Sequence, residues 1–161
     1  MNLKKKILIC ICVLFLMITT LGCEKGNDKA DIYNDKDKIA QENNNFTFVK
    51  RICNEESNDK FDMDYDGFYG TNNIWNIQSK ENGEITFDYD SVVNKGNFKA
   101  VLVHPNKEIE TILEGTEKDS KTIKLTEGKY IFKIVGKKAK GKLKISNSTN
   151  ENVNVRQGRI Y

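Results

Sequence analysis

From Phe46 onward, large apolar residues alternate with polar residues along the chain. The alternation is clearest in the segments 61–66 and 85–90, where three large apolar side chains fall on one face and polar side chains on the other. This period of two predicts strands with one buried face. The stretch 100–103 is apolar at every position, which predicts a central strand that is buried on both faces.

Further short apolar segments follow at near-regular spacing, and Gly, Asn and Asp residues separate them. These segments are 109–113, 122–125, 130–135 and 142–145. No part of the region has a sustained helical period. The pattern predicts an all-β fold, a small antiparallel β-sandwich of about seven to nine strands over residues 46–146.

The regions on either side of this predicted domain are polar. Between residues 23 and 45, Ile32, Tyr33 and Ile39 are nearly the only large apolar residues. A segment of this composition buries too little surface to offset the entropy lost on ordering, so we expect a flexible tether. Residues 147–161 are polar as well and predict a loose C-terminal tail.

The N-terminus has the layout of a secretory signal. Three lysines, Lys4 to Lys6, precede an apolar run of twelve residues, Ile7 to Ile18, and Gly22 stands just before Cys23. The run is shorter than the roughly 20 apolar residues that a membrane-spanning helix needs. Leu21-Gly22-Cys23 resembles the lipobox of bacterial lipoprotein precursors, Gram-positive type, although Thr20 stands where that family usually has Leu.

The resemblance implies that residues 1–22 are removed and that Cys23 carries a diacylglyceryl lipid. Two acyl chains hold a protein firmly on a bilayer, whereas one gives only marginal binding. We therefore expect a cell-membrane lipoprotein that is lipid-anchored on the extracytoplasmic face. Residues 128–145 also resemble the closing strands of small uncharacterised lipoprotein domains, which bring no assigned activity.

Removal of the signal changes the charge balance. The full chain has a net charge of +3, but residues 1–22 hold three of its 26 basic residues and none of its acids, so residues 23–161 carry 23 of each. This neutrality removes the basis for predicting nucleic-acid binding. The lysines are concentrated late in the chain, notably between 137 and 144, and are interpreted as the guard of an exposed edge strand. Attraction to anionic headgroups or wall polymers is the alternative.

Asp62, Asp64 and Asp66, followed by Gly67, match the first six positions of an EF-hand calcium loop. Asn73 occupies position 12, where the EF-hand requires Glu, and the flanking residues alternate as strands, so an EF-hand is excluded. Three aspartates at alternate strand positions lie about 7 Å apart and do not converge without a bend. We interpret them as solvent-facing strand residues, with a non-helical calcium loop as the alternative.

Candidates for catalysis are few. After removal of the signal, Cys53 is the one thiol left beside the lipidated Cys23, and His104 is the single histidine. We interpret Cys53 as a core residue and His104 as a strand-end residue, and one Cys with one His is too few for zinc. Trp75 is interpreted as core, with an aromatic binding surface as the alternative.

These observations favour a non-enzymatic binding module of unknown ligand, without a cofactor, whose partner is an extracytoplasmic protein or a wall polymer. A calcium-binding or calcium-stabilised surface domain is the alternative. A hydrolase-type enzyme using Cys53 and His104 ranks third.

Overall fold

Three long strands form the centre of the sheet. The computed structural model describes residues 29–158 of the chain. Strand β7 (Gly128–Thr149) pairs antiparallel with β3 (Lys60–Ser79) along one edge and with β4 (Gly83–Val103) along the other. Strand β7 therefore lies inside the sheet, with a paired strand on both sides over most of its length.

Five shorter strands complete the sheet on the outer edges of β3 and β4. Strands β1, β2 and β8 pair with β3, and β5 and β6 pair with β4. Their bounds are β1 (Asn45–Thr47), β2 (Lys50–Glu56), β5 (Ile109–Glu114), β6 (Glu117–Leu125) and β8 (Val153–Gln157). Within the described residues this is one antiparallel sheet of eight strands, which confirms the predicted all-β class.

All three long strands bend at the same level. The bend region comprises residues 66–70 of β3, 93–97 of β4 and 136–140 of β7, which are neighbours in the sheet and contain breaks in the regular pairing. Gly70 and Gly96 lie here with φ of 92° and 72°. A Cβ on Gly70 would lie 1.9 Å from the backbone oxygen of Asn45, so both the backbone conformation and the space require glycine.

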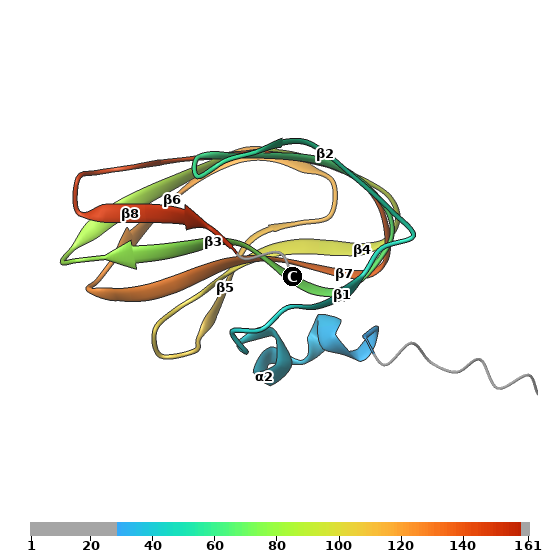
Figure 1. The fold of residues 1–161 in the computed structure, drawn as a ribbon, viewed down its shortest axis with the longest axis horizontal. Helices are drawn as coiled ribbons and strands as arrows, with labels where there is room; N and C mark the ends of the chain where they lie inside the picture. The colour runs from blue at the N-terminus through green and yellow to red at the C-terminus, as the bar shows by residue number, and fades with distance from the viewer. Residues whose placement is uncertain (1–28, 159–161) are drawn as a thin grey trace, which may run out of the picture.

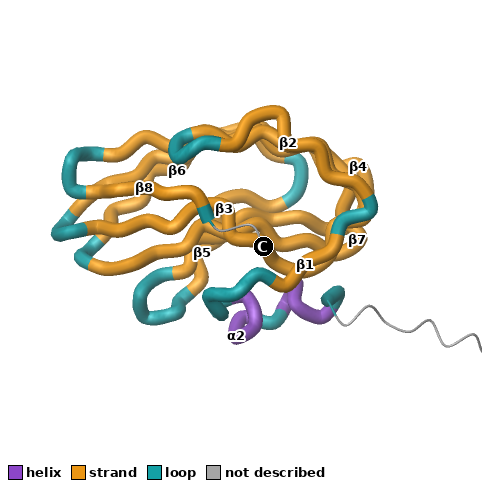
Figure 2. Tube along the Cα trace, viewed as in Figure 1, coloured by secondary structure: helices purple, strands orange, loops and turns teal. Residues whose placement is uncertain are grey.

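The bends fold the sheet into two layers (Figures 1 and 2). Layer A contains β2, β6, the first halves of β3 and β4 and the second half of β7. Layer B contains β1, β5, β8 and the remaining halves of the long strands. The opposite end of the sandwich, which we call the loop end, consists of connections between strands. These are residues 57–59, 80–82, 104–108, 126–127 and 150–152.

The main hydrophobic core fills the space between the layers. Phe87 of layer A stacks on Phe132 of layer B with ring centroids 4.8 Å apart, and Trp75 packs beside both. Trp75 is fully buried, and its indole Nε1 donates a hydrogen bond of 2.8 Å to the Ser57 carbonyl. The interpretation of Trp75 as a core residue is confirmed.

A second hydrophobic cluster covers the outer face of layer B. The 3-10 helix η1 (Asp31–Asn34) and the short helix α2 (Lys36–Ile39) lie against this face, as Figure 1 shows below the sheet. The buried members are Ile32, Tyr33 and Ile39 from the N-terminal segment and Val101, Val103 and Val135 from the sheet. The prediction of a flexible tether is therefore wrong for residues 29–45. A few apolar residues are enough to order this segment, because the sheet offers an apolar face on which they are buried.

Polar contacts also hold the N-terminal segment, which we call the strap (residues 29–44). Lys133 is fully buried, and its ammonium donates hydrogen bonds to the carbonyls of Ile39, at 2.9 Å, and of Gln41. Asn73 donates to the Glu42 carbonyl at 2.6 Å, and Tyr33 donates to Glu114 at 2.7 Å. The strap is thus fixed at several points along its length.

The predicted C-terminal boundary also needs correction. Strand β7 continues past residue 146 to Thr149, and β8, placed in the predicted loose tail, pairs with Trp75–Ser79 of β3. Val153 is only 7% exposed and belongs to the main core. The short alternation in β8 was too weak a signal by itself, and the unpaired edge of β3 supplies the hydrogen-bond partners that order it.

Candidate functional site

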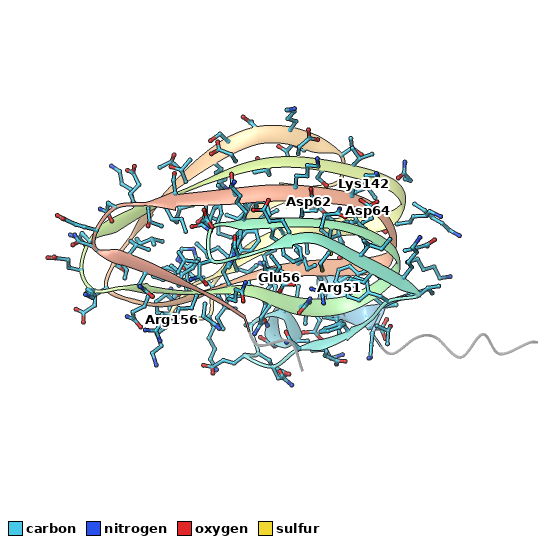
Figure 3. All side chains as sticks on the ribbon, turned by 45° about the horizontal axis from the view of Figure 1, so that its top comes forward. Arg51, Glu56, Asp62, Asp64, Lys142 and Arg156 are labelled. Atoms are coloured by element: carbon cyan, nitrogen blue, oxygen red, sulfur yellow. The ribbon has the colours of Figure 1, made fainter. Side chains whose placement is uncertain are left out.

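Rows of opposite charge cover the outer face of layer A. The aspartates of β3 alternate along the strand and face a matching row of lysines on β7. The pairs are Asp62 with Lys144 at 3.6 Å, Asp64 with Lys142 at 3.3 Å and Asp66 with Lys140 at 2.8 Å. Figure 3 shows Asp62, Asp64 and Lys142 together on this face. The antiparallel register therefore turns two separate sequence patterns into one row of ion pairs.

This arrangement corrects the interpretation of the lysine run. Strand β7 pairs with β3 on one edge and β4 on the other, so its lysines do not guard an exposed edge. Lys142 and Lys144 instead neutralise aspartates of the neighbouring strand. The hydrogen bond from Lys140, reinforced by its charge, holds the pKa of Asp66 below its usual value, and the nearby Lys95 adds to the effect.

A shallow groove of about 660 Å³ crosses the charged face. It extends across the strands from β2 to β6. Its polar lining consists of Glu55, Lys60, Asp62, Asp88, Asp90, Lys118, Asp119, Ser120, Lys144 and Ser146, and its apolar lining of Phe61, Tyr89 and Ile145. Each of the five strands of layer A contributes side chains, so the groove exists only in the folded sheet.

The groove offers both hydrogen-bond donors and acceptors. Asp90 pairs with Lys118 at 3.0 Å, and Glu55 lies 4.0 Å from Lys60. Asp88, in contrast, forms no ion pair with any described residue, and its carboxylate is exposed. Such a surface suits a polar ligand with several hydroxyl, amide or charged groups, since carboxylates accept and ammonium groups donate.

Asp62, Asp64 and Asp66, the candidate calcium ligands, lie on the outer face of layer A, and each already pairs with a lysine. They remain on one strand at alternate positions, and no group of three or more metal-binding side chains occurs among residues 29–158. The structure leaves the calcium interpretation a prediction, and the ion pairs are the competing interaction that a cation must displace.

Cys53 and His104 are not brought together. Cys53 lies on β2 in layer A and is exposed, so its interpretation as a core residue is wrong. It shares a face with the buried Met63, but β2 is an outer strand that pairs only with β3 among the described strands. His104 follows β4 in layer B, where its Nε2 lies 3.2 Å from the Glu110 carboxylate.

Sequence reasoning missed the groove residues contributed by β4 and β6, notably Asp88, Asp90 and Lys118. It also missed the pairing of the aspartate and lysine rows. Their matched spacing and opposite sign were a usable signal, because rows of this kind on adjacent antiparallel strands pair across the sheet. Cys23 and the predicted signal lie outside the described residues. Residues 29–158 contain no helix that is long and apolar enough to span a bilayer.

Comparisons with known proteins assign this chain to no family. No protein-family model and no curated protein matches it. Among solved structures, a family two carbohydrate esterase from Cellvibrio japonicus is similar with a TM-score of 0.33 and 12% sequence identity. The similarity covers 73% of this chain and 34% of the esterase chain, so this chain spans about a third of that protein. A likeness this distant assigns no activity here.

Proposed function

We propose that the protein is an extracytoplasmic lipoprotein whose β domain is a non-enzymatic binding module. The lipid anchor rests on the sequence of residues 4–23, in which a basic start, a short apolar run and Gly22-Cys23 occur in the order of a lipoprotein signal. The binding role rests on one structural observation, the polar groove across the five strands of layer A.

The composition of the groove supports a polar ligand. Its opposite charges are interleaved, so the groove presents no broad field of one sign to attract a simple polyanion. Among the described residues that line it there is no His or Cys, so it holds neither an imidazole base nor a thiol nucleophile. The ligand class that fits is an uncharged or zwitterionic polymer of the envelope, such as a wall glycan with its peptides.

The anchor is tested by Cys23→Ala in the cells that make the protein. We expect the variant to be released to the medium or to stay uncleaved, while the wild-type chain stays with the membrane fraction. Normal processing together with unchanged membrane retention would refute lipidation at Cys23.

The binding role is tested by co-sedimentation with purified cell-wall sacculi. We expect Asp88→Ala to reduce binding severalfold, because Asp88 is an exposed groove carboxylate that, like Asp119, has no lysine partner among the described residues. Glu84→Ala is the matched control, since Glu84 is an exposed acid of the same strand outside the groove. Equal losses in both variants, or no binding by the wild type, would count against the groove.

A further inference from the structure

Lysines are concentrated at the bend region and at the turn beside it. Residues 48–50, the connection after β1 and the first residue of β2, lie next to the bend of β3, because the Val49 amide donates a hydrogen bond of 2.9 Å to the Asp66 carbonyl. Together these segments contain five lysines against one aspartate, Asp66, which gives a net charge of +4. The lysines are Lys50, Lys95, Lys137, Lys138 and Lys140.

Most of this charge is not neutralised within the domain. Lys140 pairs with Asp66, whereas Lys50, Lys95, Lys137 and Lys138 form no ion pair with any described residue. Lys95 is opposite Lys140 in the sheet, and Lys138 adjoins Gly96. Four ammonium groups thus remain available to an outside anion over a continuous edge of the sandwich.

An exposed apolar side chain stands on the same edge. Val49 is 84% exposed, the highest value among the large apolar residues of the described chain. Its backbone is held against β3, so this side chain is presented to solvent by a fixed turn. A valine beside lysines is suited to a bilayer surface, where the apolar group inserts shallowly and the ammonium groups meet the headgroups.

The chain enters the domain at this end. The Lys29 ammonium donates a hydrogen bond of 2.9 Å to the Phe46 carbonyl, and Phe46 pairs with Gly70 of the bend region. In Figure 1, η1, near the start of the described chain, lies below the sheet toward the side where the long strands bend. Cys23 precedes Lys29 by six residues. Even fully extended, six residues span at most about 20 Å.

The loop end has the opposite charge. The connections 57–59, 80–82, 104–108, 126–127 and 150–152 hold five acids and two lysines, a net charge of −3. The acids are Asp59, Glu81, Glu108, Glu127 and Glu151, and the lysines are Lys80 and Lys107. The sandwich is therefore positive at the end near the chain entry and negative at the far end.

We propose that the bend surface, formed by Val49 and the lysines 50, 95, 137 and 138, docks on the anionic headgroups of the bilayer that holds the Cys23 lipid. This inference rests on the proposed lipid anchor. A strap that is fixed to layer B leaves only a short reach between lipid and domain, which brings the basic edge to the membrane. The long strands then rise from the bilayer, and the groove of layer A stays accessible from the side.

The test uses residues 24–161, which retain both hydrophobic clusters and every described contact but lack Cys23. Binding is measured by co-sedimentation with vesicles of phosphatidylglycerol and phosphatidylcholine in equal parts, and with pure phosphatidylcholine vesicles. We expect binding to the anionic vesicles only. The triple change Lys95→Gln, Lys137→Gln and Lys138→Gln should weaken it about 100-fold, at about 1 kcal/mol per lysine.

The matched control replaces three exposed lysines toward the loop end, Lys107, Lys124 and Lys129, with Gln. It makes the same change in net charge and should reduce binding by less than about fivefold. These lysines lie more than a Debye length from the docked headgroups, so salt screens their attraction to them. Val49→Ser should weaken binding by about fivefold at both low and high salt, since it removes one small apolar group.

Equal losses in the two lysine triples would overturn the proposal, and so would equal binding to both kinds of vesicle. Sedimentation with wall polymer but not with anionic vesicles would overturn it in favour of a polymer partner. The failure of this proposal is separable from failure of the anchor, because these vesicles test a chain without the lipid and the Cys23→Ala experiment tests the lipid alone. The folded state of each variant is checked by its thermal melt.

Discussion

The outer faces of the two layers are built on the same three long strands but differ in polarity and in burial. On layer A the outward side chains include aspartates and lysines in paired rows, and they are partly exposed. On layer B the outward side chains include Val101, Val103 and Val135, which the strap covers. The one outward ammonium of β7 at the centre of this face, Lys133, is fully buried.

The comparison shows that alternation along a strand does not by itself settle which face is buried. In the first half of β4 the outward positions are polar except for the exposed Val92, and water covers them. In its second half the outward positions are apolar, and a remote segment of the chain covers them. The same strand thus changes from one buried face to two as it passes through the bend region.

The largest expected difference between the faces comes from identical truncations of isoleucine. Ile39→Ala removes a side chain that is 1% exposed in the strap cluster and should lower the free energy of unfolding by about 2–4 kcal/mol. Ile52→Ala removes one that is 42% exposed on layer A and should change it by less than about 0.5 kcal/mol. Urea denaturation measures both variants, and similar losses would contradict the covered-face comparison.

Hydrogen exchange adds a second readout for Ile39→Ala. The strap is joined to the sheet without being a strand of it, so it can open locally. We expect amides of residues 31–40 to lose protection more than those of β7. Uniform loss over the whole sheet would mean that the strap and sandwich unfold as one unit.

Lys133 predicts a pH dependence that belongs to layer B alone. Burial lowers the pKa of its ammonium from 10.5 to about 8, and the charge of Glu42 opposes this shift only in part. The unfolded chain therefore binds more protons than the folded chain between these values, so the stability contributed at this site rises with pH. From pH 8 to 10 the wild type should gain about 2 kcal/mol relative to Lys133→Met.

Urea denaturation at several pH values compares these two proteins directly. Groups that titrate in the same range elsewhere, such as the Cys53 thiol, are common to both and cancel in the difference. Parallel stability curves would show that Lys133 has an ordinary pKa in the folded protein.

A smaller effect is expected from the ion pairs of layer A. The double-mutant cycle of Asp64→Asn and Lys142→Gln should give a coupling free energy of about 0.5 kcal/mol at low salt, which declines as salt is added. Asp64 combined with the remote Lys107→Gln is the control and should give no coupling. A coupling several times larger, independent of salt, would show that this face contributes to stability like a buried network.

The strand positions could be predicted well from the sequence. Which segment covers the outer face of each layer could not. Strands around Phe61–Tyr65 and Ile85–Tyr89 were predictable because one buried face imposes a period of two. The doubly buried stretch at 100–103 was predictable too, but its cover was not. Ile32 and Ile39 have no period, and only the tertiary structure brings them to that face. The ion-pair rows were visible as two patterns, and their register was not.

The smallest expected effect concerns calcium. Asp62, Asp64 and Asp66 each pair with a lysine and lie at alternate positions of one strand, so a cation must displace ammonium groups without gaining a converging set of oxygens. We expect the melting temperature to be the same with calcium as with a chelator. A true site would add about 2.7 kcal/mol at a hundredfold excess of calcium over its dissociation constant. An upward shift that Asp64→Asn abolishes would establish a calcium loop on layer A, and the ion pairs would then describe its metal-free form.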